Sequence, residues 1–296
     1  MKKHLLFLIT LVLVLSACTN PTPTPEVGQP NITVSILPQV YFVEKIAGDL
    51  VNVQAMAGTG DDPHTYEPTA DQMRLLTESD LYLTIGVEFE DAWLPRFISA
   101  NPEMQVVDSA AGVKRISATS NHEEPHGEEG SEAGELDPHI WLSPRLVKQI
   151  SQNTADALIE LDPANTETYQ SNLTQWLNEI DQVDADIRTL LQDHSHNHFM
   201  VIHPAWGYFA KEYGLEMLAV EAEGQEPGPE ELAQLLDLAQ AYQINYLFVQ
   251  KGINLKLAES IASQIGVQNV VELDPMAKDW VSNMRFIASR IAEAVK

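Results

Sequence analysis

Short runs of apolar residues alternate through most of the chain with stretches in which apolar residues recur every three or four positions. The first pattern predicts buried β-strands, and the second predicts helices that bury one face. In the first half we expect strands at residues 32–36, 51–56, 81–85 and 105–107, and helices at residues 39–49, 70–78, 91–100 and from residue 144.

The second half of the chain repeats this alternation. Strands are predicted at residues 199–202, 217–220, 246–249 and 269–272, separated by helices near Ala205, Pro229, Leu255 and Trp280. Strands that alternate with helices at this spacing form parallel sheets with helices on both faces. The predicted fold class is therefore α/β, with two doubly wound, Rossmann-like lobes.

One long helical segment separates the two halves. Asp162 and Pro163 form a helix N-cap signal with proline in the first turn, and the apolar residues that follow keep helical spacing as far as Leu191. Such a helix, about 40 Å long at 1.5 Å per residue, can run along both lobes and limit their relative motion. We therefore expect an N-terminal lobe at residues 31–161, a rigid linking helix at residues 162–193 and a C-terminal lobe at residues 194–296.

The N-terminus has the pattern of a secretory signal. Two lysines precede an apolar run that ends at Leu15 and is too short for a bilayer, which needs roughly 20 residues. The sequence Leu15-Ser16-Ala17-Cys18 that closes it is typical of a lipobox. We expect a signal peptide at residues 1–17, a lipid on Cys18 and a flexible, proline-rich tether at residues 18–30. The alternative is an ordinary signal with an incidental cysteine.

If Cys18 is lipidated, the chain has no other cysteine and therefore no disulfide. The expected location is extracytoplasmic, with the lipid holding the protein at the bacterial cell membrane. The composition is strongly acidic, with 43 Asp and Glu against 17 Lys and Arg and a formal net charge of −26. Phosphate binding needs clustered basic residues, so nucleic acid is not an expected partner.

Four residues stand out as candidate metal ligands: His64, His139, His203 and Asp274. Each falls just after a stretch that we interpret as a β-strand, and each has a proline as its sequence neighbour. Proline restricts its own backbone and that of the residue before it, which preorganises such loops. In open parallel sheets ligands bind beyond the carboxyl ends of the strands. We therefore predict that the four side chains converge in the cleft between the lobes, although a lone histidine is more often a satisfied polar or core residue.

The predicted ligand set favours zinc. Three neutral imidazoles and one carboxylate suit tetrahedral Zn²⁺, whereas Mn²⁺ usually takes more oxygen ligands. Mn²⁺ is the alternative, because geometry and supply also select the metal. A site with four protein ligands lacks the open position that a catalytic zinc keeps for water, and the chain has no nucleophile elbow, phosphate loop or dinucleotide fingerprint. These features indicate a binding protein rather than an enzyme.

The motifs around the four candidates resemble those of the ZnuA/TroA-type metal-binding proteins of ABC importers. The resemblance extends from about residue 31 to the C-terminus, and the segment from Glu223 to Pro229 is similar to a loop of that family. The motifs are Asp62-Pro63-His64-Thr65-Tyr66-Glu67-Pro68, Asp137-Pro138-His139-Ile140-Trp141-Leu142-Ser143-Pro144, His203-Pro204-Ala205-Trp206-Gly207-Tyr208-Phe209 and Leu273-Asp274-Pro275.

This resemblance implies metal-ligand roles for the four residues, two lobes joined by a rigid helix, and delivery of Zn²⁺ or Mn²⁺ to a membrane permease with a separate ATPase. We expect the protein to act as a monomer. A surface adhesin or a metal buffer on the same scaffold is the alternative function. One departure from the family is the modest histidine content of the loop before His139, which weakens the preference for zinc.

Two further groups of histidines have alternative interpretations. His122 and His126, in an acidic loop at residues 117–136, fit the H-E-x-x-H pattern of zinc proteases. Pro125 lies inside that pattern, and proline disfavours the helix the pattern needs, so a zinc protease is not expected. The loop is either a solvated acidic segment or a weak metal-capture site. The second group is at a predicted helix-to-strand junction and is either a solvated turn or a second site: His194, His196 and His198.

Overall fold

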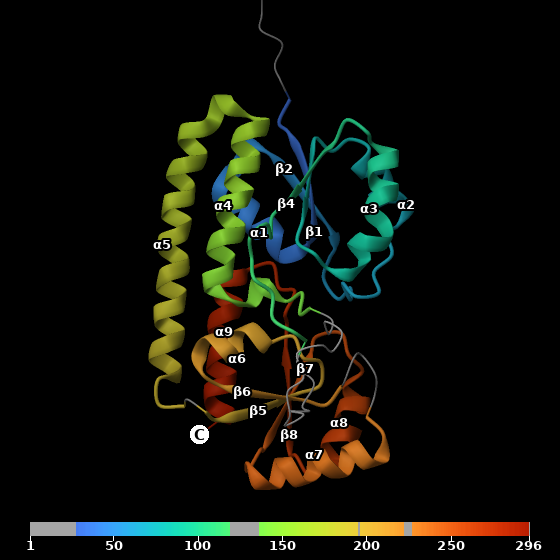
Figure 1. Ribbon diagram of the computed structural model, residues 1–296, viewed down its shortest axis with the longest axis vertical. Helices are drawn as coiled ribbons and strands as arrows, with labels where there is room; N and C mark the ends of the chain where they lie inside the picture. The colour runs from blue at the N-terminus through green and yellow to red at the C-terminus, as the bar shows by residue number, and fades with distance from the viewer. Residues whose placement is uncertain (1–27, 119–135, 195, 222–226, 296) are drawn as a thin grey trace, which may run out of the picture.

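Two four-stranded parallel sheets form the framework of the molecule (Figure 1). The computed structural model describes residues 28–118, 136–194, 196–221 and 227–295. The first sheet has the strand order β2-β1-β3-β4 and the second has the order β6-β5-β7-β8. The strands are β1 (Asn31–Ile36), β2 (Asn52–Ala57), β3 (Leu81–Thr84), β4 (Gln105–Asp108), β5 (His198–Val201), β6 (Glu216–Ala219), β7 (Tyr246–Gln250) and β8 (Asn269–Leu273).

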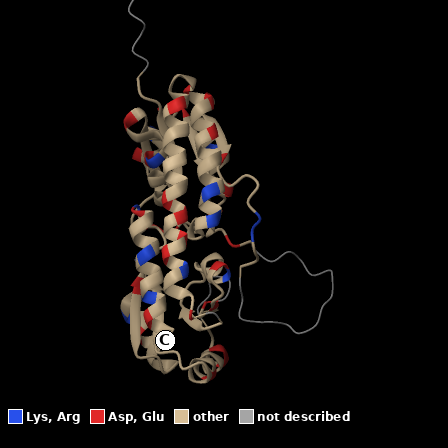
Figure 2. Cartoon of the chain, turned by 90° about the vertical axis from the view of Figure 1, so that its left-hand side faces the viewer, with Lys and Arg blue, Asp and Glu red and all other residues tan. Residues whose placement is uncertain are grey.

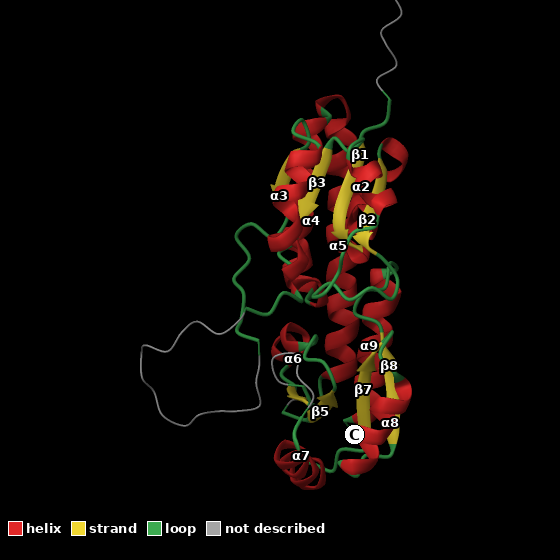
Figure 3. Cartoon of the chain, turned by 90° about the vertical axis from the view of Figure 1, so that its right-hand side faces the viewer, coloured by secondary structure: helices red, strands yellow, loops and turns green. Residues whose placement is uncertain are grey.

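Helices cover both faces of each sheet, as Figures 1 and 3 show. In the first lobe α1 and α4 lie on one side of the sheet, with α2 and α3 on the other; in the second lobe α6 and α9 lie opposite α7 and α8. The helices are α1 (Leu37–Ala47), α2 (Ala70–Leu76), α3 (Glu88–Ala100), α4 (Pro144–Leu161), α5 (Thr166–Leu191), α6 (Gly207–Tyr213), α7 (Pro229–Ala241), α8 (Leu255–Gln264) and α9 (Trp280–Ala294). The predicted α/β fold class with two parallel-sheet lobes is confirmed.

The predicted boundaries are close to the observed ones, with one instructive difference. Helix α3 begins at Glu88, three residues before the predicted start at residue 91. Glu90, in its first turn, is buried, and its carboxylate accepts hydrogen bonds from the backbone N–H groups of Ile85 and Gly86, each at 2.8 Å. An acidic residue used in this way interrupts the apolar pattern, so the pattern alone places the helix start too late.

The linking helix α5 runs alongside both lobes (Figure 1). It contains 26 residues, which corresponds to about 39 Å at 1.5 Å per residue. The first predicted turn is instead a short 3₁₀ helix at Pro163–Asn165. Helix α5 packs against α1 and α4 of the first lobe and against α9 of the second. Its buried residues keep helical spacing: Tyr169, Leu173, Trp176, Ile180, Val183, Ile187 and Leu191.

Ion pairs also tie α5 to its neighbours on the face shown in Figure 2. Lys148 of α4 lies 2.6 Å from Asp181, and Arg285 of α9 lies 2.8 Å from Asp186. Exposed pairs of this kind contribute little each, about 0 to 1 kcal/mol. The packing of apolar side chains therefore holds α5 in place, and the ion pairs add contacts to helices of both lobes.

Aromatic residues join the lobes beside α5. The ring of Trp176 on α5 contacts Phe42 of the first lobe and Trp280 of α9, at centroid distances of 6.1 and 5.7 Å. Trp280 Nε1 donates to the carbonyl of Trp141 at 2.7 Å, and Trp141 Nε1 donates to the carbonyl of Pro275 at 2.7 Å. One apolar core is consequently continuous from the first sheet to the inner face of the second.

The outer face of the second sheet has a core of its own. Leu247 and Val249 of β7 belong to this second core together with apolar residues of α7 and α8, whereas Phe248 between them belongs to the main core. This division follows from the alternation of side chains along a strand.

Among the described residues, no helix is long and apolar enough to cross a membrane. The predicted signal peptide and Cys18 lie outside the described residues.

Candidate metal centre

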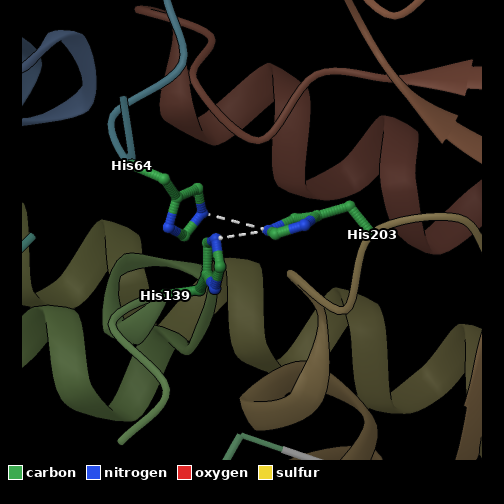
Figure 4. A group of neighbouring side chains, drawn as sticks. All are labelled: His64, His139 and His203. Atoms are coloured by element: carbon green, nitrogen blue, oxygen red, sulfur yellow. Dashed lines mark hydrogen bonds between the residues drawn. The ribbon is translucent and has the colours of Figure 1, made fainter. Parts of the chain in front are cut away.

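Three of the four predicted ligands meet between the two sheets: His64, His139 and His203 (Figure 4). The Nε2 atom of His203 lies 3.1 Å from that of His64 and 3.4 Å from that of His139. Two nitrogens that bind one zinc at about 2.0 to 2.1 Å and a tetrahedral angle lie roughly 3.3 Å apart. Both measured separations from His203 therefore match a tetrahedral site, and the ligand atoms of all three residues lie within 4.8 Å of one another.

The loops that carry the first two histidines share one turn geometry. Asp62 Oδ1 accepts a hydrogen bond from the backbone N–H of His64 at 3.0 Å, and Asp137 Oδ1 accepts one from the backbone N–H of His139 at 2.9 Å. In each Asp-Pro-His motif the aspartate thus closes a turn onto the residue two positions later, an arrangement typical of Asx turns. Proline in the middle restricts the same turn, so both imidazoles start from fixed backbone positions.

Each imidazole also faces a carboxylate through its other ring nitrogen. The Nδ1 atom of His64 lies 2.9 Å from Glu88, that of His139 lies 2.8 Å from Asp137, and that of His203 lies 3.4 Å from Glu221. A carboxylate at this place favours a proton on Nδ1 and directs the Nε2 lone pair to the ion, the usual outer shell of a histidine metal site. The three acceptors are Glu88, Asp137 and Glu221.

The electrostatics keep the centre ready for a cation. Burial lowers the pKa of His139, and the nearby His203 and His64 lower it further, against the opposing hydrogen bond and charge of Asp137. Burial alone would raise the pKa of Glu88, but the hydrogen bond and charge of His64 outweigh it and lower that pKa. Metal ligation requires a neutral imidazole, so these shifts favour the binding-competent forms.

The three histidines differ in solvent exposure. The exposed fractions of the His139, His203 and His64 side chains are 5, 15 and 24%, so the site opens to solvent at His64.

Asp274 occupies a different position from the three histidines. Its Oδ2 atom lies 3.2 Å from Nζ of Lys251, and its Oδ1 atom accepts a hydrogen bond from the backbone N–H of Met276 at 2.9 Å. It is not part of the group of ligand atoms that lie within 4.8 Å of one another. Its role as the fourth ligand stays a prediction, and the structure shows a carboxylate held by a lysine.

The other histidines do not form a comparable group. His194 Nδ1 lies 3.2 Å from the carbonyl of Val295, and the ring of His198 stacks on Tyr242 with the centroids 3.6 Å apart. His196 is largely exposed. Within the described parts of the chain, the triad of His64, His139 and His203 is the only cluster with three or more potential ligands. His122 and His126 fall outside the described residues.

The comparison with known families agrees with this centre. Residues 32–294 match the model of the family described as zinc-uptake complex component A, periplasmic. The chain belongs to this family. The description of the family as a component of a zinc-uptake complex agrees with a centre of three potential metal ligands.

Two relatives and one solved structure show how far the similarity extends. A zinc-binding lipoprotein AdcA of Streptococcus pneumoniae is 29% identical over 283 residues, which cover 93% of this chain and 56% of that protein. The high-affinity zinc uptake system protein ZnuA of Bacillus subtilis is 26% identical over 271 residues, which cover 88% of this chain and 84% of that protein. A crystal structure of ZnuA is 41% identical with a TM-score of 0.81, and the alignment covers 90% of this chain and 99% of that one. The chain thus spans about half the length of the AdcA relative.

Two site residues escape analysis of the sequence: Glu88 and Glu221. Both follow the carboxyl end of a strand, since Glu88 opens α3 just after β3 and Glu221 comes two residues after β6. This is the same topological position that identifies the histidines. An acidic residue at the end of each neighbouring strand is therefore the signal that could have found them.

Proposed function

We propose that this chain captures Zn²⁺ outside the cytoplasm and delivers it to a membrane ABC permease that a separate ATPase drives. The observation that carries this proposal is the group of three imidazoles whose ligand atoms lie within 4.8 Å of one another, each with a carboxylate on its far side. Relatives of the family with names that state zinc binding or zinc uptake support the same cargo.

The metal ligands in this proposal are His64 and His139 from the first lobe and His203 from the second, with Asp274 as the fourth. The two lobes share the ion, so binding stabilises their apposition. Three imidazoles favour zinc over manganese because Mn²⁺ takes more oxygen ligands, and Mn²⁺ is the alternative cargo. The ion is carried and released, and no side chain of the centre needs to act in a chemical step.

The anchoring of the protein is a second part of the proposal. A lipid on Cys18 would hold the chain at the membrane through the proline-rich segment that follows, and the receptor would work there as a monomer. Mass spectrometry of the membrane fraction tests this directly, because a lipid-modified N-terminal peptide beginning at Cys18 is expected. A Cys18→Ser variant is expected to leave the membrane fraction, and its retention would contradict the anchor.

A zinc-uptake experiment tests the main proposal. Cells that lack this chain are expected to lose growth in chelator-limited medium, and the native chain is expected to restore it while His203→Ala is not. His198→Ala is the matched control, since His198 stacks on Tyr242 away from the centre. Equal zinc uptake with and without the chain would refute the receptor and favour the adhesin or buffer alternative.

A further inference from the structure

The Asp-Pro loop of the second lobe repeats the turn of the two Asp-Pro-His loops. In all three, the aspartate Oδ1 accepts a hydrogen bond from the backbone N–H two residues later: Asp62 from His64, Asp137 from His139 and Asp274 from Met276. In the first two loops the residue at that later position is a predicted ligand. In the third it is the buried Met276, so the aspartate itself is the group that can reach an ion, through its remaining oxygen.

That remaining oxygen of Asp274 is held by Lys251. The contact between Nζ and Oδ2 measures 3.2 Å, and it follows from the register of the second sheet. Gln250 and Leu273 are partners at the ends of the adjacent parallel strands β7 and β8, and Lys251 N donates to the carbonyl of Leu273 at 2.9 Å. Lys251 and Asp274 are the next residues of the two strands, so the backbone brings the amine beside the carboxylate.

The loop that carries Asp274 is fixed on its other side. Asn283 of α9 donates to the carbonyl of Asp274 at 2.7 Å, and Trp141 of the first lobe donates to the carbonyl of Pro275 at 2.7 Å. The backbone is thus tied to both lobes. Lys251, with about half of its side chain exposed, is the partner that can leave without disturbing the fold.

We propose that Lys251 is a selectivity residue that competes with the bound metal for Asp274. This inference rests on the proposed function, in which the three histidines bind the ion. Zn²⁺ takes Asp274 as its fourth ligand in the proposed site, but three imidazoles already hold it, so it depends little on the carboxylate and a water molecule can take that position while the ion pair persists. Mn²⁺ depends more on oxygen ligands and has to displace Lys251 to obtain the carboxylate. Lys251 therefore weakens manganese binding more than zinc binding.

The affinities of purified protein for Zn²⁺ and Mn²⁺ test this proposal in a double-mutant cycle. Lys251→Met is expected to bind Mn²⁺ about fivefold more tightly, the scale set by a partly exposed ion pair, with a smaller change for Zn²⁺. Lys251→Arg keeps the charge and is expected to behave like the native chain. Lys256→Met removes a charge from an exposed lysine of α8 and controls for the general electrostatic effect.

The decisive measurement is the effect of Lys251→Met in protein that also carries Asp274→Asn. In Asp274→Asn protein, Lys251→Met is expected to give no gain for Mn²⁺, because the carboxylate is already lost. An unchanged Mn²⁺ affinity in Lys251→Met, or a gain that persists with Asn at position 274, would overturn the proposal. Failure of the proposed function has a separate signature, since His203→Ala would then bind Zn²⁺ as tightly as the native chain.

Discussion

The two lobes share one sheet order but prepare their metal ligands to different degrees. The first lobe supplies His64 and His139 from turns that their own motifs close, with outer carboxylates at 2.9 and 2.8 Å. The second lobe supplies His203, whose outer carboxylate is 3.4 Å away, and the predicted ligand Asp274, whose carboxylate is paired with a lysine. The first lobe is therefore the more preorganised half of the candidate site, and the proposed ligation by Asp274 requires the second half to adjust.

The cores of the lobes differ in the same sense. The first sheet belongs wholly to the core that continues into α5 and α9, whereas the outer face of the second sheet packs with α7 and α8 in a separate core. Packed interiors respond to strain as units rather than by continuous deformation. The outer layer of the second lobe is therefore a packing unit separate from the core around the linking helix, and Leu273 at the end of β8 belongs to the latter.

The most severe test of this comparison is His139→Ala, which removes the most buried ligand of the preorganised half. Zinc affinity is expected to fall by more than the 10- to 100-fold that loss of an outer partner costs. The thermal midpoint of the zinc-loaded protein should fall with it, because binding to the native state adds RT ln(1 + [L]/Kd) to stability. Calorimetric titration checks the first effect, and an isotherm like that of native protein would refute the site.

The outer carboxylates test the asymmetry itself. Asp137→Asn removes the charge that orients His139 at 2.8 Å and is expected to weaken zinc binding about 10- to 100-fold. Glu221→Gln acts on His203 across 3.4 Å and is expected to weaken it by less than about tenfold. Competition with a zinc chelator measures both. If Glu221→Gln proved the more damaging of the two, the second lobe would be the preorganised half.

Acidification is expected to weaken zinc binding slightly near neutral pH and steeply below about pH 6.5, the ordinary histidine pKa. The proton competes with the ion at each imidazole. His139, whose pKa burial lowers, is expected to stay neutral at a lower pH than an ordinary histidine. Because its folded pKa lies below its unfolded value, the unfolded chain takes up the proton first, so metal-free stability falls as pH drops below about 6.5.

Titrations of zinc affinity and of the metal-free thermal midpoint between pH 7.5 and 5 check both parts. His139→Gln, which cannot titrate there, is the control for the stability slope. A metal-free midpoint that rose on acidification through this range would contradict the burial of a neutral His139.

Most helices and strands could be predicted from the sequence because they depend on patterns of residues that are close in the chain. The eight strands and the linking helix bury apolar residues at fixed periods, and helix ends carry proline or capping residues, as at Ser143 before α4. The three histidines could be placed because parallel strands deliver their loops to one edge. Each of these inferences needs only residues that are close in the chain and one general rule of topology.

The partners of the ligands could not be predicted because they depend on contacts between distant segments. Glu88 meets His64 across 24 residues of sequence, and Lys251 meets Asp274 across the β7–β8 pairing. Nothing in the local sequence distinguishes an aspartate that faces an ion from one that faces a lysine. The sequence therefore cannot show that Asp274, the fourth predicted ligand, is paired with Lys251.

The smallest expected effect on zinc affinity comes from the hydrogen bond that joins the two halves beside the site. Trp141→Phe removes the donor to the carbonyl of Pro275 and is expected to cost about 1 to 3 kcal/mol of metal-free stability, since a buried acceptor loses its partner. Zinc affinity should change little, because the histidines keep their turns and carboxylates. Chemical denaturation and chelator competition measure the two quantities. A large loss of zinc affinity with little loss of stability would contradict this expectation. It would mean that the hydrogen bond from Trp141 to Pro275 positions the second lobe for metal binding.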